Sequence, residues 1–265
     1  MTPTYWQQQT ASKPLFPDIE WSKPEQRALA GRLGIIGGNK LGFAAVAEAY
    51  STAHDSGVGE VRVLLPDALR KTIPPSMTEV VLSPSNPSGS LSREALPDMQ
   101  ALAHWSTMLL LVGDAGRNSE TAIVYSDMLR TYSGPLVITR DAIDLIKNDT
   151  AALVNRPSTA LVLSFAQLQK LFQAVYYPKM LTFSMQLMQL VEAVHKFTIT
   201  YPVTLVVLHR ETVVVAHDGN VTTTAWENPL AIWRGTTATR AAAYWAWNPS
   251  HPLEALTASL ITDQT

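Results

Sequence analysis

Short apolar runs recur along the chain between residues 33 and 163. They are continuous rather than alternating, which is typical of strands buried on both faces of a sheet. The runs predicted as strands are Leu33–Ile36, Val61–Leu65, Glu79–Leu82, Met108–Val112, Leu136–Thr139 and Leu161–Leu163. Between several of them, apolar side chains at spacings of three and four predict helices over 40–55 and 119–132, and a third over 182–197. Alternating strands and helices indicate a mostly parallel α/β sheet with helices on both faces.

The pattern changes after residue 200. Three close-set apolar runs predict antiparallel strands: Val203–Leu208, Val213–Ala216 and Val221–Thr224. The turn residues Asp218-Gly219 between the last two are a strong hairpin signal. Helices are predicted over 237–247 and 252–261. We therefore expect an antiparallel extension and two closing helices after the parallel sheet.

The first 22 residues are rich in Gln, Thr and Pro. They predict an N-terminal arm over 1–22, followed by one domain over 23–265. Either Trp6, Phe16 and Trp21 anchor this arm to the domain, or the terminus is frayed. Ser22, with Glu25 three residues later, fits a capping box and predicts a short helix over 23–30.

Composition narrows the class of protein. The chain has 265 residues, 20 Lys and Arg against 22 Asp and Glu, and no cysteine. Without a basic excess, a nucleic-acid partner held through phosphate neutralisation is not expected. Thiolate catalysis and Cys-ligated metal sites are excluded. No apolar run reaches the roughly 18 residues that span a bilayer, and the start of the chain lacks the features of a secretory signal. We expect a cytoplasmic protein without a membrane partner.

Candidate chemistry lies in the loops after the predicted strands, because open α/β sheets bind ligands at the carboxyl ends of their strands. The loop at Gly37-Gly38, the loop over 112–120 and the loop over 234–247 each join a strand or turn to a helix start. Backbone amides at a helix start favour anions. Each loop alone is equally compatible with a tight turn or an ordinary helix cap.

Taken together, the loops resemble a known family. Segments matching its motifs in order are 31–38, 57–61, 77–80, 112–114, 141–143 and 203–221, and the loop at 235–238 comes last. The chain resembles the ADP/ATP-dependent NAD(P)H-hydrate dehydratases of the ribokinase-like superfamily over about residues 25–262. The resemblance implies a three-layer sandwich around a mostly parallel sheet.

The resemblance also implies an activity and a set of contacts. The family uses ADP or ATP, with Mg, to phosphorylate the hydroxyl of hydrated NAD(P)H, and loss of phosphate restores the nicotinamide ring. Its members commonly form homo-oligomers. By this likeness, the residues implied for the nucleotide or phosphate are Gly235, Thr236, Thr237, His209 and Arg210. The residues implied for the NAD(P)H-like substrate are Gly38, Asn39, Gly42, Gly113 and Gln167.

The last loop departs from the family at the catalytic position. The family's Gly-Thr-Gly-Asp, whose Asp activates the hydroxyl, is here Gly235-Thr236-Thr237-Ala238. We therefore expect weak or absent catalysis with residual nucleotide or phosphate binding. Asp141 is either a substitute base or the N-cap of a helix over 142–147. The alternatives are an active dehydratase with a displaced base, or a small-molecule kinase of the same superfamily.

Two further groups of side chains admit a ligand or a structural role. His209 and His217 either share a metal or lie at solvent-facing strand ends, and the second interpretation is preferred because no third ligand is near in sequence. No metal site is therefore expected. Tyr244, Trp245 and Trp247 form either a shelf for adenine or a buried helix face, and burial is preferred.

Overall fold

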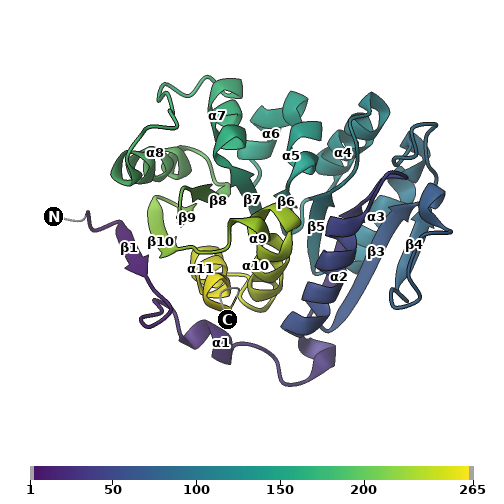
Figure 1. The fold of residues 1–265 in the computed structure, drawn as a ribbon, viewed down its shortest axis with the longest axis horizontal. Coiled ribbons are helices and arrows are strands. Elements are labelled where there is room, and N and C mark those ends of the chain that lie inside the picture. Colours follow the sequence, from purple (N-terminus) through teal and green to yellow (C-terminus); the bar gives the residue numbers. More distant parts are fainter. Residues whose placement is uncertain (1–2, 263–265) are drawn as a thin grey trace.

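A ten-stranded sheet forms the centre of the protein (Figure 1). The structure is a computed structural model that describes residues 3–262, apart from the side chains of residues 229, 231 and 262. The strands lie in the order β1-β10-β9-β8-β7-β6-β5-β2-β3-β4. They are β1 (Trp6–Gln9), β2 (Arg32–Gly37), β3 (Glu60–Pro66), β4 (Val80–Ser83), β5 (Met108–Gly113), β6 (Leu136–Thr139), β7 (Thr159–Ser164), β8 (Thr204–His209), β9 (Thr212–His217) and β10 (Asn220–Ala225).

The pairing confirms the predicted mixture of parallel and antiparallel strands. Every neighbouring pair from β4 to β8 is parallel, whereas β9 runs antiparallel to both β8 and β10. The turn between β9 and β10 places Asp218 at φ 44° and Gly219 at φ 73°. Two successive left-handed residues are what a tight hairpin turn requires.

Helices cover both faces of this sheet, so the protein has three layers (Figure 1). One face carries α3 (Leu96–Trp105), α4 (Ser119–Thr131), α5 (Asp141–Leu145), α6 (Thr150–Val154), α7 (Phe165–Ala174) and α8 (Leu187–Thr200). The other carries α2 (Ala44–Ser56), α9 (Pro229–Arg234), α10 (Thr236–Trp247) and α11 (Pro252–Thr262). Within residues 3–262, none of the helices has both the length and the apolarity to cross a membrane.

The continuous apolar runs follow from these three layers. In β2, Ile36 packs into the core on the α3–α8 face, and its neighbour Ile35 packs into the core on the other face. In β5, Leu109 and Leu110 divide in the same way. Successive side chains of a strand point to opposite faces, so both faces must be apolar when helices cover both.

The N-terminal segment adds a strand to the sheet. β1 pairs in parallel with β10, and the indole of Trp6 donates a hydrogen bond to Thr223 Oγ1 at 2.9 Å. Gln9 is buried, and its amide donates to Thr224 Oγ1 and to the Thr257 carbonyl of α11. Of the three side chains named as possible anchors, Trp21 does not anchor the arm, because it lies at the end of α1 (Asp18–Trp21) and is 87% exposed.

One predicted helix is absent, and another begins later than predicted. Over 23–30 the chain makes only a 3-10 turn at Arg27–Leu29, and Ser22 ends α1 rather than capping a new helix. The capping-box spacing is therefore present without the helix. The predicted helix 182–197 begins later, at Leu187, where Gln186 and Gln189 form a capping box. Phe183 is consequently outside the helix and largely exposed.

Gln9 provides a test of how firmly β1 is held. Gln9→Ala removes two buried hydrogen bonds and leaves the Thr257 carbonyl without that donor, so we expect a loss of about 1–3 kcal/mol in the free energy of unfolding. Urea denaturation of the purified chain measures it. Gln8→Ala, at the exposed neighbouring position, is the matched control and should change stability by less than about 0.5 kcal/mol. Equal effects at both positions would show that β1 is not docked in this way.

Candidate functional site

The loops after β2 and β5 meet at the carboxyl edge of the parallel sheet. The Gly38 amide donates to the Gly113 carbonyl at 2.9 Å. Gly38 and Gly113 both have positive φ, 85° and 91°. A Cβ at Gly38 would lie 2.8 Å from a Leu65 side-chain carbon, so this close approach requires glycine. The structure therefore brings together these two residues of the implied substrate set.

Asp114, the residue after β5, joins two elements through its carboxylate. Oδ2 accepts a hydrogen bond from the Ala45 amide in the first turn of α2 at 2.8 Å, and Oδ1 forms an ion pair with Arg140. Asp114 and Arg140 both have positive φ, 53° and 59°. A negative charge is favoured at the start of a helix. The N-terminus of α2 is thus occupied by a carboxylate of the protein itself.

Asp141 holds the same loop from the other side. Its Oδ1 accepts from the Asp114 amide at 2.7 Å, and its Oδ2 accepts from the Ala115 amide at 3.1 Å. The expected N-cap role is wrong, because Asp141 is the first residue of α5 and Arg140 stands at the cap position. Burial, with the Asp141 carboxylate adding to it, raises the pKa of the Tyr125 hydroxyl, so this buried phenol stays protonated.

Gln167 is committed to the protein rather than open to a ligand. It completes a capping box with Ser164 at the start of α7. Its amide also donates to the Arg140 carbonyl at 2.8 Å and to the Asp144 carboxylate at 3.1 Å. Gln167 therefore helps hold Arg140 in place.

Most of the first turn of α10 is buried, and Thr236 is half-buried. Gly235 stands at the cap position with φ 96°, so neither Thr236 nor Thr237 is the N-cap. A Cβ at Gly235 would lie 2.9 Å from a Val112 side-chain carbon and 3.8 Å from Arg140 Cδ, which places this turn over the ends of β5 and β6. Ala238 has 0% of its surface exposed and Thr237 has 1%. The methyl of Ala238 therefore packs in the core.

The remaining residues implied for substrate form a separate polar cluster. The buried Asn39 amide donates to Ser90 Oγ and to the Ser88 carbonyl, which ties the loop after β2 to the loop after β4. Gly42 pairs with Asn39 across a short bridge, and a Cβ there would meet nothing within 4 Å. Gly42 is thus open to solvent.

The two histidines do not share a site. His209 ends β8, and His217 lies at the far end of β9. The expected solvent exposure is wrong for His209, which is 5% exposed, packs on Phe165 and contacts the Met185 carbonyl at 3.1 Å. Burial lowers the pKa of both imidazoles. Arg210 sits exposed in the following turn. Within residues 3–262 there is no cluster of three metal-ligating side chains.

The aromatic residues of α10 serve the core, as preferred above. Tyr244 and Trp245 are 6% and 3% exposed and pack among the helices of this face. The Trp247 indole donates to the Ala30 carbonyl at 3.1 Å. These rings stabilise the contact of α10 with its neighbours and leave little surface on which adenine could stack.

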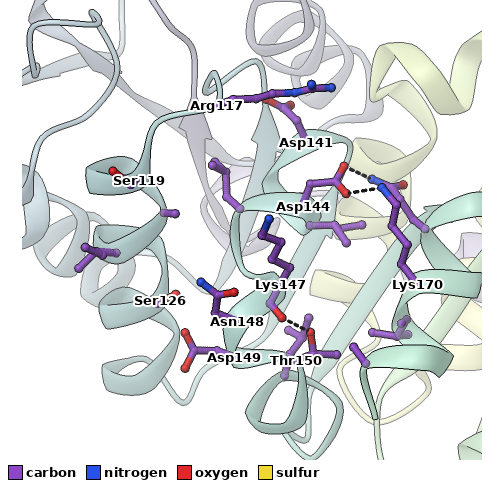
Figure 2. A pocket seen from close by; sticks show the side chains of 18 of the residues that line it. Arg117, Ser119, Ser126, Asp141, Asp144, Lys147, Asn148, Asp149, Thr150 and Lys170 are labelled. Atoms are coloured by element: carbon purple, nitrogen blue, oxygen red, sulfur yellow. Dashed lines mark hydrogen bonds and ion pairs between the residues drawn. The ribbon is translucent and has the colours of Figure 1, made fainter. Parts of the chain in front are cut away.

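A hollow lies on the face of the sheet that α4 and α7 cover, opposite the face that α10 covers (Figure 2). The sequence did not indicate it. It has a volume of about 1170 Å³ and runs between α4, the segment from α5 to α6, and α7. Its upper end touches the carboxyl edge at Gly116, Asp141 and Gln167. The side chains that line the hollow come from three separate helical segments, so no local sequence motif indicates it.

Comparison with known proteins defines the class of fold. No family profile matches the chain. A ribokinase-like superfamily protein from Enterococcus faecalis superposes with a TM-score of 0.74 at 14% identity, over 98% of this chain and 87% of that one. With the mostly parallel sheet and three layers described above, this shows that the chain has a ribokinase-like fold.

Within that fold, the chain is similar to NAD(P)H-hydrate dehydratases. The ADP/ATP-dependent NAD(P)H-hydrate dehydratase from Bacillus subtilis, co-crystallised with ATP and Mg²⁺, gives a TM-score of 0.60 at 12% identity, over 93% of this chain and 85% of that one. The bifunctional NAD(P)H-hydrate repair enzyme Nnr from Moorella thermoacetica is 28% identical over 130 residues. This match covers 48% of the chain and only 24% of that larger protein.

Asp141 provides a test of the loop geometry. In Asp141→Asn the amide can present only one oxygen to the two backbone donors, so one buried amide loses its acceptor. We expect a loss of about 1–3 kcal/mol in the free energy of unfolding, measured by chemical denaturation. Asp144→Asn, at an exposed carboxylate paired with Lys170, is the control and should cost less than about 1 kcal/mol. If Asp141→Asn is as mild as the control, the carboxylate does not support this loop.

Proposed function

We propose that this chain is a non-catalytic protein of the NAD(P)H-hydrate dehydratase type. The observation that carries the proposal is Ala238, a fully buried methyl at the start of α10. In the resembled family an Asp at this position takes the proton of the hydroxyl that is phosphorylated. A positioned base contributes about 10²–10⁴-fold to such a step. Alanine can neither accept the proton nor reach solvent here.

The neighbouring carboxylates do not supply a substitute. Both oxygens of Asp141 accept backbone amides of the loop after β5. The Asp114 carboxylate is divided between the Ala45 amide and Arg140. Moving either group toward a substrate would leave buried backbone donors without a partner, at a cost of about 1–3 kcal/mol each. This argues against the alternative of an active enzyme with a displaced base at Asp141.

Residual binding of a nucleotide is the second part of the proposal. ADP or ATP, with Mg²⁺, would place its phosphates beside Gly235 and Thr236, where the positive end of a twelve-residue helix adjoins Arg140. Support comes from the similar Bacillus subtilis dehydratase, which was co-crystallised with ATP and Mg²⁺. His209 and Thr237 are buried, so these two side chains are not expected to contact the nucleotide, although the resemblance implies them. A homo-oligomeric assembly, implied by the resemblance, and a cytoplasmic location, expected from the sequence, belong to the proposal as well.

Absence of turnover is the first prediction of this proposal. Purified protein incubated with hydrated NADH and ADP or ATP should give no recovery of the absorbance of the reduced nicotinamide. An active dehydratase of the resembled family, assayed in parallel, is the positive control. Recovery at an ordinary enzymatic rate that is lost in Asp141→Asn would refute the proposal and identify Asp141 as the base.

Nucleotide binding is predicted separately. Thermal unfolding with ADP or ATP and Mg²⁺ should raise the Tm, because a ligand that binds only the folded state stabilises it. Each kcal/mol gained corresponds to about 2–4 °C at this chain length. The ligand-induced increase should disappear in Arg140→Gln and persist in Lys71→Gln, an exposed lysine after β3. An increase that survives in Arg140→Gln would place the nucleotide elsewhere.

A further inference from the structure

The hollow between α4 and α7 is a second place where a ligand could bind. Figure 2 shows Lys147 pointing into its middle from the segment between α5 and α6, with Arg117 at its upper end near Asp141. We propose that this hollow binds a nucleoside monophosphate, or a phosphorylated metabolite of the same shape, with Arg117 and Lys147 as the phosphate contacts. The proposal concerns a surface away from the start of α10 and does not depend on the loss of catalysis.

Most charged side chains that line the hollow already have an ion-pair or hydrogen-bond partner within the protein. Arg130 pairs with Asp149 at 2.5 Å and with Asp127 at 3.4 Å. A hydrogen bond from Ser126 and the contact with Arg130 lower the pKa of Asp149, so this carboxylate stays ionised and bound. On the other wall, Lys170 pairs with Asp144 at 3.3 Å. The fourth carboxylate, Asp141, is held by backbone amides.

Two cations of the lining form no ion pair. The guanidinium of Arg117 and the ammonium of Lys147 are exposed, and no salt bridge or side-chain hydrogen bond holds either of them within residues 3–262. The hollow has equal numbers of acidic and basic side chains, so its formal charge is zero, and these two cations are the basic groups of the lining that are not already paired. An anion with several acceptor oxygens is the complement of two such donors. Ser119 and Asn148 add neutral polar groups at the same surface.

The lining also has an apolar part. Ala122 and Ile123 of α4 lie across from Leu171 and Ala174 of α7, and Ile123 is 38% exposed. An exposed isoleucine in a concave surface gains from contact with a ring. Ligand pockets combine mostly apolar walls with a few polar groups, over about 300–1,000 Å³. The hollow, at about 1170 Å³, can take a ring and a phosphate together.

The experiment is a calorimetric titration of the full chain with AMP, adenosine and inorganic phosphate. We expect AMP to bind more tightly than either part alone, and its affinity to fall as salt is raised. Lys147→Gln and Arg117→Gln should each weaken AMP about fivefold to tenfold, because each removes one charge-assisted contact. Lys71→Gln is the matched control for a surface lysine and should leave the affinity unchanged.

The variant at Arg140 separates this site from the nucleotide site proposed above. Arg140→Gln should leave AMP binding intact if the ligand lies in the hollow. Ala174→Trp, which fills the lower end without changing a charge, should weaken it. The proposal is overturned if AMP does not bind at millimolar concentration, or if its binding depends on Arg140 and not on Lys147. Neither of these results would test the separate prediction that dehydratase turnover is absent.

Discussion

Backbone amides at the carboxyl edge of the sheet are bound by carboxylates of the chain itself. Asp141 accepts two amides of the loop after β5, and Asp114 accepts one at the start of α2 while pairing with Arg140. Parallel strands leave their loops and helix starts at one edge, where unpaired donors gather. A ligand anion can satisfy such donors in a binding site. Here internal carboxylates do so, and the surrounding loops depend on them.

The same hydrogen bonds limit how these carboxylates could act as catalytic bases. A carboxylate that organises a loop cannot also move freely to accept a proton, because leaving the loop exposes unsatisfied amides. Thr237 and Ala238 in the first turn of α10 are buried, so neither side chain faces solvent. Packed side chains and internal carboxylates therefore both stabilise this edge of the sheet.

The sequence was a good guide to the fold because its main signal is local. Each predicted strand is present, since strands such as β5, with apolar neighbours like Leu109 and Leu110, must be apolar on both faces. β1 was missed because Gln7 and Gln8 are exposed and its pairing with β10 is distant in sequence. The helix predicted over 23–30 failed for the opposite reason, since a capping signature cannot show whether a helix finds a face to bury.

The site was less predictable, because its contacts join residues far apart in the chain. Asp114 lies in a loop that the sequence leaves equally compatible with a tight turn or a helix cap, yet it contacts Ala45 and Arg140 across 69 and 26 positions. The sequence marks out Ala238 only through the resemblance to a family, which implies an Asp at this position. That Ala238 is buried could be seen only in the structure.

The distribution of charge distinguishes the two faces of the protein. On the α10 face, Arg140 has its partner in Asp114, so an incoming phosphate must compete with an internal anion. On the α4–α7 face, the side chains of Arg117 and Lys147 form no ion pair within residues 3–262. Binding to cations that are not already paired avoids the cost of breaking an existing ion pair. A phosphorylated ligand in the hollow would therefore displace no ion pair of Arg117 or Lys147, whereas one beside Gly235 would compete with Asp114 for Arg140.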